Sequence, residues 1–118
     1  MKSYSIKNLS NEKILGDNIS LADSFFSRMK GLLGRSTLAT GEGLIITSCK
    51  SIHMVFMKFA IDVIFIDRDD KVVGVVNRIK PYQFSPVFFN ANRAIELPAG
   101  IASQVNVQLG DQLEILPN

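Results

Sequence analysis

The chain has 118 residues, of which 47% are hydrophobic and 20% are charged, and its formal net charge at neutral pH is +2. This length predicts one domain spanning residues 1–118, able to bury roughly two thirds of the surface its unfolded chain exposes. The small net charge and the absence of any run of Lys or Arg argue against a nucleic-acid partner. Since no stretch reaches the roughly 18 apolar residues of a membrane span, we also expect no membrane partner.

Cysteine usage and the first residues indicate the compartment. The single cysteine, Cys49, cannot form an internal disulfide, and a free thiol is typical of a reducing cytosol. The opening MKSYSIKNLSN lacks the apolar core of a secretory signal peptide. We therefore expect a soluble cytoplasmic protein.

The first third of the chain predicts a hairpin and then a helix. Residues 3–9 and 12–16 alternate weakly around the turn residues Ser10-Asn11, which favours two short strands. An amphipathic helix is expected near residues 21–32, with Ser20 as its N-cap. Its apolar stripe consists of Ala22, Phe25, Phe26, Met29, Leu32 and Leu33.

The remaining two thirds predict short strands. Residues 44–47 form one apolar strand, and the runs 60–66 and 71–77 form a hairpin around Asp69-Asp70. An irregular connection through Tyr82 and Phe84 precedes strands at 94–97 and 112–116, whereas residues 101–107 are ambiguous between a helical turn and a loop. Many short strands with one helix indicate a mainly β fold with a minor α part, either a compact β-sandwich or a partly open barrel.

The stretch from Cys49 to Asp67 is the first candidate site, because it contains the only cysteine, the only histidine and two of the four methionines. Cys49, His53 and Met57 are each four residues apart, or roughly 13 Å in an extended strand. Zinc ligands lie about 2.0–2.3 Å from one centre, so we expect no metal, and we expect no cofactor. Cys49 could instead act as a nucleophile with His53, although a lone cysteine is more commonly a small buried hydrophobe.

Two carboxylates interrupt apolar runs and form the second candidate. Asp62 has the apolar period-2 neighbours Ala60 and Ile64, so a buried Asp62 would need a partner. Glu96 lies between Ile95 and Leu97, where alternation could simply place it in solvent. Arg28, on the polar side of the expected helix, is one possible partner, and such a pair would be structural.

These observations leave three functional hypotheses. The first is a monomeric or weakly dimeric binding module that takes a small apolar ligand or a peptide in a Met/Phe-lined groove; its expected ligand-binding residues are His53, Met57, Asp62, Glu96 and Arg28. The second is a hydrolase or transferase that uses His53 with Cys49 or with a carboxylate. The third is that the motifs are purely architectural.

Five motifs in order resemble the prokaryotic family called domain of unknown function 192. They are RMKGLLGR (28–35), GEGLII (41–46), CKSIHMVFMKFAIDVIFID (49–67), IELPAG (95–100) and LGDQLEI (109–115). The resemblance implies a compact β-rich fold with one helix against it, and it implies no activity. Many relatives begin with a signal peptide or lipoprotein start, from which this sequence departs. The positions that match the family pattern are Arg28, Gly31, His53, Met57, Asp62, Asp67, Glu96 and Gly100.

Overall fold

The computed structural model describes residues 2–22, 35–55 and 57–118. Within these residues, strands dominate and one short helix precedes the last strand. The elements are β1 (Tyr4–Asn8), β2 (Lys13–Ala22), β3 (Glu42–Thr47), β4 (Ile61–Ile66), β5 (Val72–Ile79), β6 (Arg93–Pro98), α2 (Ile101–Gln104) and β7 (Leu113–Pro117).

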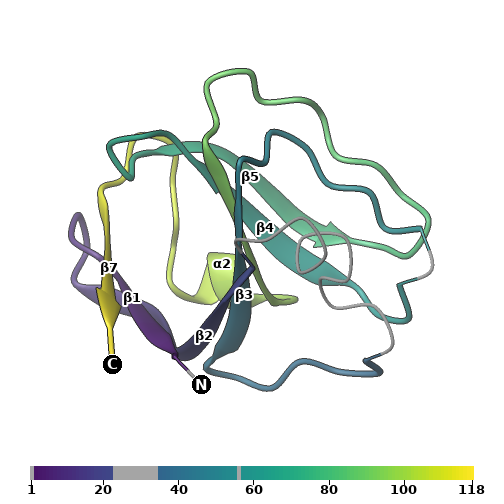
Figure 1. Cartoon of the computed structure of the whole chain (residues 1–118), viewed down its shortest axis with the longest axis horizontal. Coiled ribbons are helices and arrows are strands. Elements are labelled where there is room, and N and C mark those ends of the chain that lie inside the picture. The colour runs from purple at the N-terminus through teal and green to yellow at the C-terminus, as the bar shows by residue number, and fades with distance from the viewer. Residues whose placement is uncertain (1, 23–34, 56) are drawn as a thin grey trace.

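The strands form one curled sheet in the order β5-β4-β6-β3-β2-β1-β7 (Figure 1). The pair β2–β3 is parallel, and the other neighbouring strands are antiparallel. The two edge strands meet at one end, where Lys71 and Gln112 form an isolated bridge and the Val72 N–H donates to the Asp111 carbonyl. The sheet is therefore a half-barrel, which confirms the prediction of a mainly β fold with a partly open barrel.

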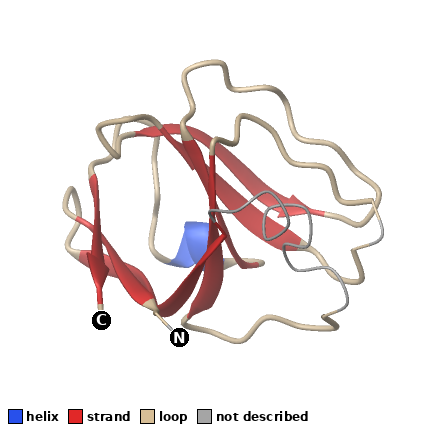
Figure 2. Cartoon of the chain, viewed as in Figure 1, coloured by secondary structure: helices blue, strands red, loops and turns tan. Residues whose placement is uncertain are grey.

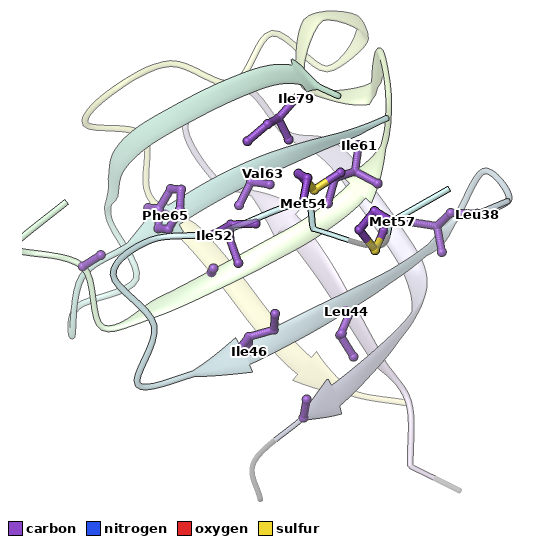
Figure 3. Close-up of a cluster of buried hydrophobic side chains, with 13 residues drawn as sticks. Leu38, Leu44, Ile46, Ile52, Met54, Met57, Ile61, Val63, Phe65 and Ile79 are labelled. Carbon is purple, nitrogen blue, oxygen red and sulfur yellow. The ribbon is translucent and has the colours of Figure 1, made fainter. Parts of the chain in front are cut away.

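Both faces of the sheet are packed. The short helix α2 lies within the curve of the sheet (Figure 2) and packs there against β4, β5 and β6. We call the apolar side chains on this side the concave cluster; it contains Ile6, Leu15, Ile19, Ile45, Ile64, Ile66, Val72, Ile95, Leu97, Ile101, Ala102, Val107 and Leu113. The convex cluster, on the other side (Figure 3), contains Ala22, Leu38, Leu44, Ile46, Ile52, Met54, Met57, Ile61, Val63, Phe65, Ile79, Ala91 and Ala94.

Strand β4 explains why the sequence IDVIFI is almost continuously apolar. Ile61, Val63 and Phe65 belong to the convex cluster, whereas Ile64 and Ile66 belong to the concave cluster. Successive side chains of a strand point to opposite faces, so a strand covered on both faces needs apolar residues at nearly every position. The one polar residue in this strand, Asp62, is fully buried.

The predicted hairpins and strands are confirmed, and the ambiguous segment after Gly100 forms α2. The predicted helix start at Ser20 is wrong, because β2 continues through Ala22 and pairs in register with β3, Ser20 opposite Leu44. Extended pairing with a buried neighbour strand outweighs the N-cap preference there. The rest of the expected helix, residues 23–32, lies outside the described residues. No helix in the described part of the chain is long and apolar enough to cross a membrane.

Candidate functional site

The residues expected to form one site lie in different places. Asp62 points to the concave face and Glu96 to the convex face, because they lie on neighbouring strands in a register that pairs Asp62 with Leu97 and Glu96 with Val63. Met57 is part of the convex cluster and only 8% exposed, whereas His53 is exposed. Arg28 lies outside the described residues. The two carboxylates and the imidazole therefore do not converge on one pocket.

Asp62 is held by three backbone N–H groups. One carboxylate oxygen accepts from Arg78, 2.8 Å away, and the other accepts from Gly100 at 3.0 Å and Ala102 at 2.9 Å. Arg78 lies where the β4–β5 register shifts, and it has a positive φ of 51°. Asp62 thus joins an irregular point of β5 to the beginning of α2, which meets the expectation that a buried carboxylate here needs partners.

Glu96 has a different environment. Its neighbours across the sheet, Leu44 and Val63, are both apolar and belong to the convex cluster. The side chain is 6% exposed, and within the described residues its carboxyl group makes no hydrogen bond or ion pair. Burial raises the pKa of Glu96 to about 7, because removal from water disfavours the charged form. The prediction that alternation could place Glu96 in solvent is wrong, since the face it points to is covered.

Cys49 and His53 engage different groups. The Cys49 thiol lies 3.2 Å from the carbonyl oxygen of Ser51. His53 forms an isolated antiparallel bridge with Phe84, and the two rings are tilted with centroids 6.4 Å apart. Among the described residues, no group of three His, Cys, Asp or Glu side chains is placed to hold a metal ion.

His53 belongs to a long irregular ribbon on the convex side, formed by residues 49–55 and 82–92. The N–H groups of Met54 and Ser85 donate across it to Gln83 and Ile52, each at 2.8 Å. Farther along, Phe88 donates to Lys50 at 2.8 Å. Figure 1 shows the two segments running side by side beyond the sheet. We refer to this pair of segments as the aromatic ribbon.

The aromatic ribbon is anchored to the sheet by Phe88. The Phe88 ring packs against Phe65, with centroids 4.6 Å apart, and it lies over Gly74 of β5. A Cβ atom at Gly74 would come within 2.5 Å of that ring, so only glycine leaves room for it. The Lys50 ammonium group adds a second fixed point, donating to the carbonyl oxygens of Phe89 at 2.8 Å and Ala91 at 3.0 Å.

Side chains of the aromatic ribbon that point away from the sheet are large, apolar and exposed. Phe84 is 71% exposed, Phe89 80%, Tyr82 65% and Val87 51%. The sequence predicted only an irregular connection through Tyr82 and Phe84 and did not identify this surface. Aromatic residues in a proline-framed connection were the available signal, since a loop has no core of its own to bury them.

A polar pocket of about 390 Å³ lies at one end of the aromatic ribbon. Phe89, Asn90 and Lys50 line it from the ribbon, and Asp67, Arg68 and Asp69 line it from the β4–β5 turn. Asp67 shapes that turn by accepting the N–H groups of Asp69 and Lys71 on one oxygen, at 2.8 and 3.0 Å. The arrangement therefore combines an exposed apolar strip with a polar pocket at its end.

Comparison with known proteins places the chain in a family. The family model DUF192, described as "Uncharacterized ACR", matches residues 6–115. A UPF0127 protein of Thermococcus sibiricus is 33% identical over 106 residues, covering 86% of this chain and 68% of that protein. A UPF0127 protein of Pyrococcus furiosus is 33% identical over 110 residues, covering 91% of this chain and 94% of that protein.

The fold also matches a solved structure. A protein of unknown function from Novosphingobium aromaticivorans has a TM-score of 0.80 and 22% identity, with 94% of this chain and 82% of that chain covered. At this identity the match shows a shared fold. Together with the family match over residues 6–115, it confirms the resemblance found in the sequence motifs, and the chain belongs to the DUF192 family.

Proposed function

We propose that this protein is a binding module that takes an extended peptide segment on the aromatic ribbon. The observation behind the proposal is the row of exposed Phe84, Val87 and Phe89 on a backbone fixed by hydrogen bonds and by Phe88. Scattered exposed apolar residues are ordinary, whereas several large ones along one segment mark an interaction surface. The cytoplasm is the compartment that accompanies this proposal, because a chain with a single cysteine cannot form an internal disulfide.

Burial of these side chains can supply useful affinity. Covering one Phe or Val side chain stabilises a complex by roughly 1.5–3 kcal/mol before the costs of association. The anchored backbone reduces those costs, because the surface is already ordered before a partner arrives. His53, which faces Phe84, adds a ring nitrogen that can donate a hydrogen bond to a peptide carbonyl.

The proposal changes the binding surface expected from the sequence. Met54 and Met57 are buried in the convex cluster, so the aromatic ribbon presents phenylalanine in place of a mixed Met/Phe lining. Both carboxylate oxygens of Asp62 accept backbone N–H groups, which favours the architectural alternative for this residue. Of the five residues expected to bind a ligand, His53 is the one that the proposal retains on the binding surface.

Selection from a displayed random-peptide library on the purified protein tests the proposal. We expect enriched peptides to bind with micromolar affinity and to shift backbone NMR signals of residues 49–55 and 82–92. The double variant Phe84→Ser, Phe89→Ser should lose most of this binding. Leu109→Ser is the matched control, because Leu109 is 69% exposed but lies outside the aromatic ribbon.

Two results would contradict the proposal. One is a selection that enriches no binder to the folded protein. The other is a set of binders whose NMR shifts centre elsewhere and whose affinity does not change in the Phe84→Ser, Phe89→Ser variant.

A further inference from the structure

We propose that the peptide bound by the aromatic ribbon is acidic, with apolar residues over Phe84, Val87 and Phe89 and carboxylates at the end near Lys58 and Lys80. This inference rests on the proposed function, because it specifies the chemistry of the partner for the same surface. It comes from the charges around the ribbon and not from the exposed aromatic residues themselves.

The two stretches of sequence that contain the aromatic ribbon have no acidic residue. The chain has 11 Asp and Glu residues, and none of them falls within residues 48–61 or 77–95. The same two ranges contain Lys50, Lys58 and Lys80, all of them exposed, together with exposed Arg78 and with Arg93, which pairs with Asp70. A surface with this composition attracts anionic partners and disfavours cationic ones.

The lysines differ in what they can offer a partner. The Lys50 ammonium group is already bound to two carbonyl oxygens, and Asp67 and Asp69 in the nearby pocket offset the charges of Lys50 and Arg68. Lys58 and Lys80 take part in none of the ion pairs that the structure describes, which lie elsewhere in the chain. Among the three lysines of these ranges, Lys58 and Lys80 are therefore the two whose ammonium groups have no described hydrogen bond or ion pair.

These two lysines lie at the opposite end of the aromatic ribbon from the pocket. Lys80 belongs to the turn in which the Gln83 N–H donates to the Lys80 carbonyl, and Lys58 follows Met57, whose N–H donates to Met54. Met54 in turn accepts the N–H of Tyr82, so both turns adjoin the same end. A peptide carboxylate placed over these two turns can interact with the ammonium groups of Lys58 and Lys80, whereas at the pocket end Asp67 and Asp69 offset the charges of Lys50 and Arg68.

The same features favour a peptide over other anions. A membrane surface is flat and would leave the pocket of about 390 Å³ unfilled, whereas a peptide that continues past Phe89 can place polar groups in it. A nucleic acid needs a track of cations along its phosphates. Here Lys58 and Lys80 lie at one end, and the other end is lined by both signs of charge, Lys50 and Arg68 with Asp67 and Asp69.

The test uses fluorescein-labelled peptides that share a Leu-Tyr-Leu centre and differ in the residues at one end, which are paired glutamates, glutamines or lysines. We expect the glutamate peptide to bind about tenfold more tightly than the glutamine peptide at low salt, with the lysine peptide weakest. Added salt should narrow this difference, since exposed charge pairs are screened. The variant Lys58→Gln, Lys80→Gln should weaken the glutamate peptide roughly fivefold and leave the glutamine peptide unchanged.

The control is Lys13→Gln, an exposed lysine of β2 outside the aromatic ribbon, which should bind all three peptides as the parent protein does. Equal affinity for the glutamate and glutamine peptides would overturn the acidic assignment and leave the proposed function standing. Binding of anionic lipid vesicles or single-stranded oligonucleotides, without binding of the glutamate peptide, would overturn the choice of partner. Two results together would support both proposals. The variant Phe84→Ser, Phe89→Ser loses binding of all three peptides, and the parent protein binds the glutamate peptide more tightly than the glutamine peptide.

Discussion

Each face of the sheet buries one carboxyl group, and the two groups have opposite surroundings. On the concave face, Asp62 accepts three backbone N–H groups and joins β5 to α2. On the convex face, Glu96 is surrounded by the apolar neighbours Leu44 and Val63, and its pKa is raised to about 7. One carboxylate is thus a fixed part of the fold, and the other is tolerated by taking up a proton.

Removing Asp62 should have the largest effect and would show how much the concave face depends on it. Asp62→Ala leaves the N–H groups of Arg78, Gly100 and Ala102 without their acceptor, the first two in partly buried positions and the third in a buried one. Because each hydrogen bond to a charged group contributes about 1.5–3 kcal/mol, we expect the free energy of unfolding to fall by about 4 kcal/mol or more. Chemical denaturation gives this value.

Hydrogen exchange separates this cause from general destabilisation. The amides of Gly100 and Ala102 should lose protection in Asp62→Ala more than amides of β1 and β2, which are far from Asp62 in the sheet order. Asp62→Asn, which keeps one acceptor oxygen, should fall between the parent and the alanine variant. A melting temperature unchanged in Asp62→Ala would show that water replaces the carboxylate without cost.

Replacing Glu96 should change the free energy of unfolding in the opposite direction, by an amount that depends on pH. Its pKa is about 7 in the folded protein and 4.5 when unperturbed, so the folded state binds more protons between these values. The contribution of Glu96 to stability is therefore most favourable below about pH 4.5, is lost as the pH rises through about 7, and stays constant above it. Glu96→Gln should remove this loss and stabilise the protein by about 3 kcal/mol at pH 8, with little effect at pH 4.

Urea denaturation across this pH range measures the difference, and Asp69→Asn serves as a control because Asp69 is exposed. The sequence suggested Arg28 as a partner for one of the two carboxylates. An Arg28–Glu96 pair would hold the carboxylate charged, and Glu96→Gln would then destabilise the protein at pH 8. The sign of the change at pH 8 therefore distinguishes a solitary Glu96 from a paired one.

The sequence predicted most strands of the half-barrel because strands have a pattern that can be recognised within a few consecutive residues. Period-2 alternation and β-branched residues identify β4 and β5, and the turn at Asp69-Asp70 joins them as expected. The same pattern predicted that a buried Asp62 needs a partner. It could not identify Gly100 and Ala102 as partners, because these lie about forty residues away and approach only when α2 packs into the curve of the sheet.

The candidate site was harder to predict because the aromatic ribbon has no periodic pattern. Phe88 is an anchor over Gly74, whereas its neighbour Phe89 is 80% exposed, and nothing local in the sequence SPVFFN distinguishes the two. The distinction depends on how residues 82–92 pair with residues 49–55, a contact between distant segments. Ser20 shows the same limit, since pairing of β2 with β3 outweighs a local N-cap signal.

Alanine variants of Phe88 and Phe84 should have smaller effects on stability. They compare a side chain packed on the convex face with one on the surface above it. Phe88→Ala removes a ring that packs on Phe65 and Gly74, so we expect a loss of about 2 kcal/mol, less than for a fully buried phenylalanine. Phe84→Ala removes a ring that is 71% exposed, and the free energy of unfolding should stay within about 0.5 kcal/mol of the parent value. Peptide binding should show the reverse order when measured under conditions where both variants are folded, because Phe84 contacts the partner directly and Phe88 only supports the backbone. Equal losses of stability at the two positions would mean that Phe84 belongs to the core. Phe84 would then not be available to contact a peptide.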